Sequence, residues 1–144
     1  MIRLATADDI GWLLEIAERF ISETSYDIVY DPEAARNHLL TYIHHSDADI
    51  LLADGGGAMV AASREFQKQP FCYVGKFFVI PGSRRTGTAR EIVEAILAWA
   101  SLHGCSHVFV TATAGLAERE QRLFINLMKR YGFIESGPVL FRGV

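Results

Sequence analysis

The sequence has little cysteine, little net charge and no long apolar run, and each absence excludes a class of protein. Its two cysteines, Cys72 and Cys105, offer neither a disulfide framework nor metal-site spacing, and no His, Cys and acidic cluster has ligand spacing. No apolar stretch approaches the ~20 residues of a membrane-spanning helix, and the N-terminal residues lack the layout of a secretory signal. These absences predict a cytoplasmic protein without a bound metal or a membrane partner.

A basic excess is missing as well. The formal net charge is −3 at pH 7, so the chain has no general positive field that would hold nucleic acid. No internal repeat, linker or low-complexity tract divides its 144 residues, half of which are hydrophobic. We therefore expect one globular domain spanning residues 1–144 and no nucleic-acid partner.

Hydrophobic periodicity alternates between the strand and helix patterns along the chain. Helices are expected after the caps Thr6 and Asp31, the first running to about residue 22 and the second to about residue 45. Two further helices are expected from Ala89 to about residue 103 and over residues 117–130. The expected strands are residues 2–4, 49–53, 58–66, 71–80, 106–112, 133–135 and 139–141. Residues 54–57, Asp-Gly-Gly-Gly, read as a hairpin turn, since no helix pattern and no Gly-Lys-Ser/Thr follows them. The pattern predicts a mixed α+β fold.

One stretch carries a chemical signal. The apolar strand end at residues 77–80 is followed by a basic loop and then by an amphipathic helix. A helix N-terminus presents unpaired N–H groups and partial positive charge, and Arg84, Arg85 and Arg90 add full charges around it. Gly87 and Ala89 keep side-chain bulk away from the backbone. Together these residues predict an anion-binding loop suited to a pyrophosphate.

The order of these parts resembles a known motif. Val79-Ile80-Pro81 followed by Arg84-x-x-Gly87-x-Ala89 is similar to the acetyl-CoA-binding motif of the GNAT (GCN5-related) N-acetyltransferases, whose pattern is Arg/Gln-x-x-Gly-x-Gly/Ala. The Ala-Thr-x-x-Asp helix start near the N-terminus and the Gly132-Phe133 pair after the last helix resemble the same family.

The resemblance implies a GNAT-like acyl-CoA N-acyltransferase fold, with a mostly antiparallel central sheet of about seven strands and about four helices. It implies acetyl transfer from acetyl-CoA to a primary amine of a small molecule or protein, and it leaves a homodimer open. The coenzyme would contact the strand end and the loop, through Phe78, Val79, Ile80, Arg84, Arg85, Thr86, Gly87, Thr88, Ala89 and Arg90. A backbone N–H near Phe78 or Val79 would polarise the thioester carbonyl. The linker after the first helix, with Tyr26 and Tyr30, would border the acceptor, although ordinary loop packing explains these tyrosines equally well.

The chain departs from the family pattern where acid–base catalysis is expected. The position of the usual general-acid Tyr holds Met128, the usual Asn appears as Gln121, and residues 71–80 contain no acid. Glu65 and Tyr131 are the remaining candidates for proton transfer, while a solvated edge charge and a core tyrosine are their simpler interpretations. Two alternatives to an enzyme follow: a non-catalytic CoA-binding domain with a regulatory role, and a nucleic-acid module using the loop arginines, against which the acidic total counts.

Overall fold

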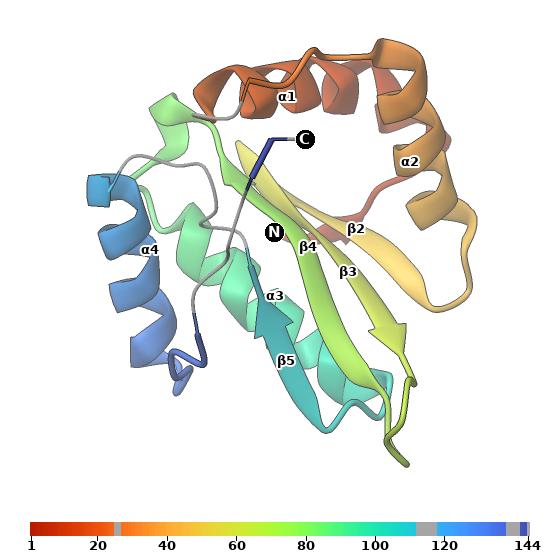
Figure 1. The fold of residues 1–144 in the computed structure, drawn as a ribbon, viewed down its shortest axis with the longest axis vertical. Helices are drawn as coiled ribbons and strands as arrows, with labels where there is room; N and C mark the ends of the chain where they lie inside the picture. The colour runs from red at the N-terminus through yellow and green to blue at the C-terminus, as the bar shows by residue number, and fades with distance from the viewer. Residues whose placement is uncertain (25–26, 112–117, 138–141, 144) are drawn as a thin grey trace.

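The computed structural model describes residues 1–24, 27–111, 118–137 and 142–143. These residues form a mixed α+β domain with a central sheet and four α-helices (Figure 1). The helical elements are η1 (Ala7–Asp9), α1 (Ile10–Glu23), α2 (Pro32–His44), η2 (Pro81–Ser83), α3 (Thr88–Leu102) and α4 (Glu118–Arg130). The strands are β1 (Arg3–Leu4), β2 (Ala48–Ala53), β3 (Gly56–Ser63), β4 (Phe71–Val79) and β5 (His107–Val110).

The five strands of the described residues lie in the order β1-β2-β3-β4-β5. The first three pairings are antiparallel, and β5 pairs with β4 in parallel after the crossover through α3, which gives the mostly antiparallel sheet that was expected. This is the predicted fold class, with a strand count below the expected seven. Residues 133–135, a predicted strand, have no regular structure, and residues 139–141 lie outside the described residues.

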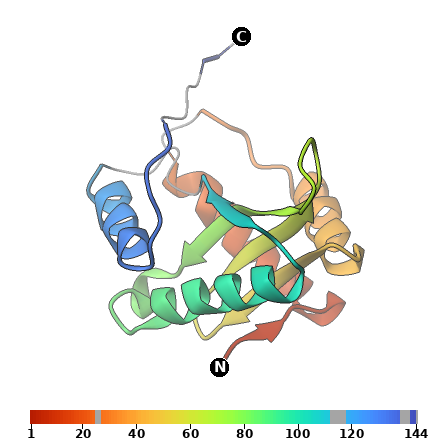
Figure 2. The same ribbon diagram turned by 90° about the horizontal axis from the view of Figure 1, so that it is seen from below.

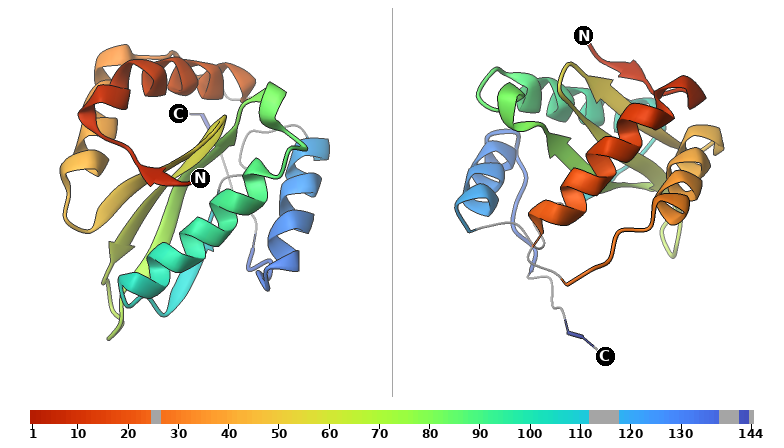
Figure 3. Two further views of the ribbon diagram at one scale, coloured as in Figure 1. Left: turned by 180° about the vertical axis from the view of Figure 1, so that it is seen from behind. Right: turned by 90° about the horizontal axis from the view of Figure 1, so that it is seen from above.

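Helices cover both faces of the sheet (Figures 2 and 3). Side chains of β2 alternate between the faces: Ile50 and Leu52 pack in one core with α1 and α2, and Leu51 and Ala53 pack in the other with α3. Cys72 belongs to the second core and is completely buried, which raises the pKa of its thiol to about 12. It therefore serves as a small residue of the core.

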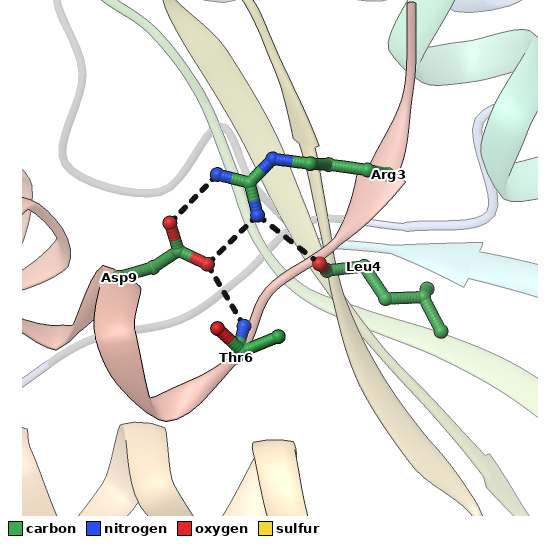
Figure 4. A network of polar contacts seen from close by, with 4 residues as sticks. All are labelled: Arg3, Leu4, Thr6 and Asp9. Atoms are coloured by element: carbon green, nitrogen blue, oxygen red, sulfur yellow. Dashed lines mark hydrogen bonds and ion pairs between the residues drawn. The ribbon is translucent and has the colours of Figure 1, made fainter.

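Polar caps fix where the N-terminal helices begin. The Asp31 carboxylate accepts hydrogen bonds from the backbone N–H groups of Glu33 (2.9 Å) and Ala34 (3.2 Å), which confirms the predicted start of α2. Asp9 accepts from the Thr6 backbone N–H (2.8 Å) and forms a two-pronged ion pair with Arg3 at 2.7 and 2.8 Å (Figure 4). These contacts tie β1 to the start of α1.

The predicted end of β3 is wrong by three residues. The strand stops at Ser63 rather than at Phe66 because the side chain of Gln67 forms hydrogen bonds with backbone groups that would otherwise pair with a neighbouring strand. Its amide oxygen accepts from the N–H groups of Glu65 and Phe66, and its amide nitrogen donates to the carbonyl of Ser63. Glu65 consequently lies in a loop.

Candidate functional site

The strands β4 and β5 pair over only half the length of β4. Phe71–Val74 face His107–Val110, and beyond Val74 the described residues pair β4 with β3 alone. A β-bulge marks the point of separation: Met59 lies opposite Lys76 while Val60 lies opposite Val74, which leaves Gly75 as the extra residue. Because bulges bend and twist a strand, this one directs the second half of β4 away from β5. One edge of that half is left without a partner strand in the described part of the chain.

Hydrogen bonding identifies which backbone groups line the open edge. The Ile80 N–H donates to the Gly55 carbonyl on the β3 side (2.8 Å). Backbone groups of successive strand residues point to opposite edges, so the N–H and carbonyl of Val79 point away from β3. The Val79 carbonyl indeed accepts a hydrogen bond from Nε of Arg84 (3.0 Å). Of the two amides predicted as oxyanion donors, that of Val79 therefore faces the open edge and that of Phe78 faces β3.

The loop after β4 holds its own shape. Arg85 and Gly87 adopt left-handed backbone conformations, with φ of 74° and 91°, and Gly87 is the N-cap of α3. The hydroxyl of Thr86 donates to the Ser83 carbonyl (2.6 Å) and lies 3.0 Å from that of Thr88, which donates to the Asp54 carbonyl (3.2 Å). Both hydroxyls are thus used inside the protein, and the first N–H groups of α3 are left for an external acceptor.

The glycine-rich turn between β2 and β3 packs beneath this loop. Gly55 has φ of 78°, and a Cβ there would overlap the side chain of Ser83. A Cβ on Gly56 would lie 2.7 Å from the carbonyl oxygen of Phe78. The predicted hairpin turn is present but shorter than residues 54–57, since it comprises Asp54 and Gly55 while Gly56 and Gly57 begin β3. The close approach explains why glycine occupies positions 55 and 56.

A cleft of about 710 Å³ joins the open edge of β4 to the loop. Its walls come from α1, the end of β4, the loop and α4. The lining residues are Ile16, Arg19, Phe20, Glu23, Phe77, Phe78, Val79, Ile80, Pro81, Arg84, Arg85, Ala89, Arg119, Glu120, Leu123, Phe124 and Leu127. Four arginines and two glutamates make the lining positive, although the chain as a whole is acidic. The cleft is therefore suited to an elongated anion with an apolar portion.

Arg84 connects two walls of the cleft. Besides its bond to Val79, its guanidinium forms an ion pair with Glu23 at the end of α1 (3.0 Å). Both side chains are about 40% exposed, and exposed pairs of this kind contribute only about 0–1 kcal/mol to stability. Such a pair can be exchanged for another anion at small cost.

A second pocket, of about 280 Å³, lies between α1, α2 and the sheet. It shares Ile16, Phe20 and Phe78 with the cleft, so the two spaces adjoin. Tyr30 lines this pocket and donates its hydroxyl hydrogen bond to the Leu14 carbonyl (3.2 Å). Burial, with the nearby carboxylates of Glu18 and Asp31, raises the Tyr30 pKa. Tyr26, the other predicted acceptor contact, lies outside the described residues.

The structure does not bring the two acid–base candidates to the cleft. Glu65 interacts with the hydroxyl of Tyr73, near the opposite end of β4, where burial and this carboxylate raise the Tyr73 pKa. Tyr131 donates to Glu94 of α3 (3.0 Å). Met128 is 4% exposed and belongs to the core, as its helical spacing indicates. None of these three side chains lines either space.

Sequence reasoning assigned one arginine that does not line the cleft and missed two that do. Arg90 does not line it, and its charge acts on the hydroxyl of Tyr131. Arg19 of α1 and Arg119 of α4 line the cleft from opposite sides. Each sits on an ordinary helix surface without a local motif, and only the tertiary fold brings them near the loop.

The described residues contain no group of three or more His, Cys, Asp or Glu side chains that could hold a metal ion. None of their helices is both long and apolar enough to cross a bilayer.

Comparisons with known proteins agree with this geometry. The sequence model of the Acetyltransferase (GNAT) family matches residues 13–133. No curated protein sequence gives a significant match. Among solved structures, the chain is similar to the aminoglycoside N-acetyltransferase AAC(6')-Iy in complex with CoA, with a TM-score of 0.73, 17% identity and coverage of 100% of this chain and 93% of that one.

Two other structures are similar over nearly their whole length. The aminoglycoside 6'-N-acetyltransferase AAC(6')-IG from Acinetobacter haemolyticus gives a TM-score of 0.73 at 16% identity, covering 100% of this chain and 97% of that one. A transcriptional regulator from Bacillus halodurans C-125 gives 0.75 at 13% identity, covering 100% and 99%. At such identities the likeness establishes the fold and not the substrate.

Proposed function

The chain belongs to the Acetyltransferase (GNAT) family, and on that premise we propose that it is an acetyl-CoA-dependent N-acetyltransferase acting on a primary amine of a small molecule or protein. The observation that carries the proposal is the cleft in which an open strand edge meets a helix N-terminus among arginines. Acetyl-CoA would supply the acetyl group: the amine nitrogen bonds to the acetyl carbon, the carbon–sulfur bond breaks, and the amine's lost proton balances the thiolate.

The loop and the start of α3 would hold the pyrophosphate. Backbone N–H groups from Arg85 to Ala89 and the helix dipole attract anions, and Arg84 and Arg85 add charge-assisted hydrogen bonds. Such bonds contribute roughly 1.5–3 kcal/mol each where water is excluded. Gly87 leaves the approach open, since an added Cβ would meet no protein atom within 4 Å.

The open edge of β4 would hold the amide-containing arm of the coenzyme as an added strand does. Its Val79 N–H is placed to donate to the thioester carbonyl oxygen, on which negative charge develops during transfer. Phe77 and Phe78 line the same part of the cleft and would exclude water from the reacting groups.

Few groups are placed for proton transfer. Among the described residues, Glu23 and Glu120 are the carboxylates that line the cleft, and Glu23 is paired with Arg84. This leaves Glu120 to accept the proton of the amine, directly or through water. General acid–base catalysis contributes about 10²–10⁴-fold, so the loss of the usual tyrosine predicts slow turnover rather than none.

A non-catalytic CoA-binding domain is the second candidate. The positions of Met128 in the core and of Tyr131 on Glu94 favour it, because neither supplies an acid to the cleft. Release of free thiol from acetyl-CoA in the presence of amines separates the two candidates. Coenzyme binding without thiol release across a broad amine panel would support the binding domain.

Coenzyme binding is tested with a pair of matched glycine variants. Gly87 and Gly104 lie at opposite ends of α3, both with positive φ and with no atom within 4 Å of an added Cβ. Changing either to Glu imposes similar backbone strain, roughly 1–2 kcal/mol. We expect CoA and acetyl-CoA to raise the Tm of the wild type and of Gly104→Glu, and to leave Gly87→Glu unchanged. An equal ligand-induced shift in both variants would remove the loop from the proposal.

A further inference from the structure

The pocket beside the cleft differs from it in chemistry. Most of its lining is aliphatic or aromatic, contributed by α1, α2 and the sheet: Leu13, Ile16, Ala17, Phe20, Ile21, Val29, Ala34, Ala35, Leu39, Met59 and Phe78. Its volume of about 280 Å³ is at the small end for ligand sites, and would hold a single aliphatic or aromatic side chain rather than several linked rings. The pocket is therefore suited to one compact apolar group.

The pocket has one cation without an acidic partner. Lys76 lines it, with Nζ 5.4 Å from the centre of the Phe20 ring, and no described carboxylate pairs with this amine. The described carboxylate that lines the pocket, that of Asp31, accepts two backbone hydrogen bonds through Oδ1 as the N-cap of α2. The thirteen residues outside the described ranges (residues 25–26, 112–117, 138–141 and 144) include no Asp or Glu. Within the pocket itself, Asp31 is thus the one described acidic side chain available to balance the positive charge of a ligand.

The pocket opens toward the atoms proposed to act on the amine. Lys76 and Phe78 are two residues apart on β4, so their side chains lie on the same face of the strand and both line the pocket. Phe78 also lines the cleft, and the next residue is Val79. A molecule whose apolar group fills the pocket would extend its polar end past Phe78 into the cleft.

We propose that the acceptor is a small primary amine with one apolar group and one carboxylate, of the kind found in hydrophobic amino acids. The apolar group occupies the pocket between α1 and α2, and Lys76 binds the carboxylate. This inference rests on the proposed function only in calling the ligand the acceptor. Binding of such amines to the pocket can be measured without turnover. Polycationic amines are disfavoured in this pocket, since burying several positive charges beside Lys76 with one carboxylate among the described lining residues is unfavourable.

The test measures equilibrium binding by calorimetry on the full chain, in the presence of CoA and in its absence. The probes are L-phenylalanine, L-leucine, 2-phenylethylamine, which lacks the carboxylate, and kanamycin, which carries several amines. We expect both amino acids to bind, 2-phenylethylamine to bind at least fivefold more weakly than L-phenylalanine, and kanamycin to give no binding. Failure of both amino acids to bind, or kanamycin binding as tightly as they do, overturns the inference.

Two lysine variants test the role of the cation. Lys76→Met should bring the affinity for L-phenylalanine down to that for 2-phenylethylamine while leaving acetyl-CoA binding unchanged. Lys68→Met, which removes an exposed lysine from the loop between β3 and β4, is the control and should behave as the wild type. Unchanged L-phenylalanine binding in Lys76→Met contradicts the proposal.

Thiol release separates this inference from the proposed function. Binding of L-phenylalanine without thiol release from acetyl-CoA would keep the pocket assignment and count against the enzyme. Thiol release with kanamycin but with neither amino acid would keep the enzyme and overturn the acceptor class.

Discussion

Arg84 shows how one side chain can prepare a binding site before any ligand arrives. Its Nε donates a hydrogen bond to the Val79 carbonyl, which fixes the guanidinium beside the open edge of β4. A terminal nitrogen of the same guanidinium forms an ion pair with Glu23. The motif predicts an arginine that binds phosphate. In the structure this guanidinium already pairs with a carboxylate of α1, so a phosphate bound beside it would meet a competing negative charge.

Removing that carboxylate should strengthen coenzyme binding. In Glu23→Gln we expect the Kd for CoA to fall about two- to fivefold, because a competing negative charge leaves a cleft that receives a polyanion. The Tm should change little, since the pair is exposed. Glu15→Gln, an exposed site on the same helix outside the cleft, changes the net charge equally and should leave Kd as in the wild type. Weaker binding by Glu23→Gln would instead make Glu23 a residue that positions Arg84.

Asp9 makes the stability of the N-terminal segment depend on pH. The hydrogen bonds from Arg3, followed by that from the Thr6 N–H, lower the Asp9 pKa from 3.8 to about 2. A carboxyl whose pKa is lower in the folded state stabilises that state above its unfolded pKa, and the contribution is lost as the pH falls toward the folded pKa. The stabilisation should thus be complete above about pH 4–5 and disappear near pH 2.

Urea unfolding of Asp9→Asn at several pH values tests this dependence. We expect the variant to be less stable than the wild type by up to about 1 kcal/mol at pH 6, with the difference shrinking below pH 4. Asp8→Asn is the control, since the Asp8 side chain has no hydrogen bond or ion pair to the described residues. A difference for Asp9→Asn that stays constant from pH 6 to pH 3 would contradict the assignment.

At the scale of elements, α3 joins the binding loop to the rest of the protein. Its N-terminus follows the loop proposed to bind the pyrophosphate, and its last turns are fixed to β2 by the indole N–H of Trp99, which donates to Asp49 (2.8 Å). Trp99 is 5% exposed, so the loss of its partner would leave a buried donor unsatisfied. This hydrogen bond therefore anchors to β2 the end of α3 that lies opposite the loop.

We expect Asp49→Ala to lower the free energy of unfolding by about 1–3 kcal/mol, the usual cost of an unpaired buried donor. Asp47→Ala, at an exposed position two residues earlier, should have a much smaller effect. Chemical denaturation followed by circular dichroism measures both variants. Equal destabilisation by the two substitutions would show that the hydrogen bond to Trp99 is unimportant.

The elements that sequence reasoning predicted well are those defined by neighbouring residues. The strand-loop-helix unit and the cap at Asp31 depend on local chemistry, and each has its predicted form. The glycine hairpin is also where it was predicted, although Gly56 and Gly57 belong to β3 rather than to the turn. The end of β3 was wrong because the side chain of Gln67 satisfies backbone groups that the hydrophobic pattern assigned to a strand. Periodicity carries no information about such a competing side chain.

At the scale of the whole molecule, the cleft belongs to no single element. Arg19 of α1 and Arg119 of α4 lie about a hundred positions apart in the sequence and come from opposite faces of the sheet, yet they line one space. Glu65 and Tyr131 were candidates because they lie close in sequence to the central strand and to Met128. In the folded protein both lie away from the cleft. Tertiary placement, which a single sequence does not encode in any local pattern, decides these assignments.

A ligand bound in the cleft would contact helices from both faces of the sheet and should raise the free energy of unfolding of the whole domain. At a CoA concentration of 100 times Kd the expected gain is about 2.7 kcal/mol. Hydrogen exchange followed by NMR would locate the contacts: the Val79 amide, which faces the open edge, should exchange more slowly when CoA is added. The Phe78 amide, which faces β3, should be slow with and without it. A Val79 amide that is unaffected by CoA would contradict the proposed role of this edge.

The packing of Gly55 and Gly56 against Ser83 and Phe78 has a consequence for engineering. A hairpin turn with three glycines has the appearance of a tolerant surface site, where a peptide tag or a foreign loop is commonly inserted. Here such an insertion would push against Ser83 and Phe78 and displace the loop proposed to bind the pyrophosphate from the strand edge. Grafts at residues 54–57 should therefore abolish coenzyme capture while the rest of the fold survives.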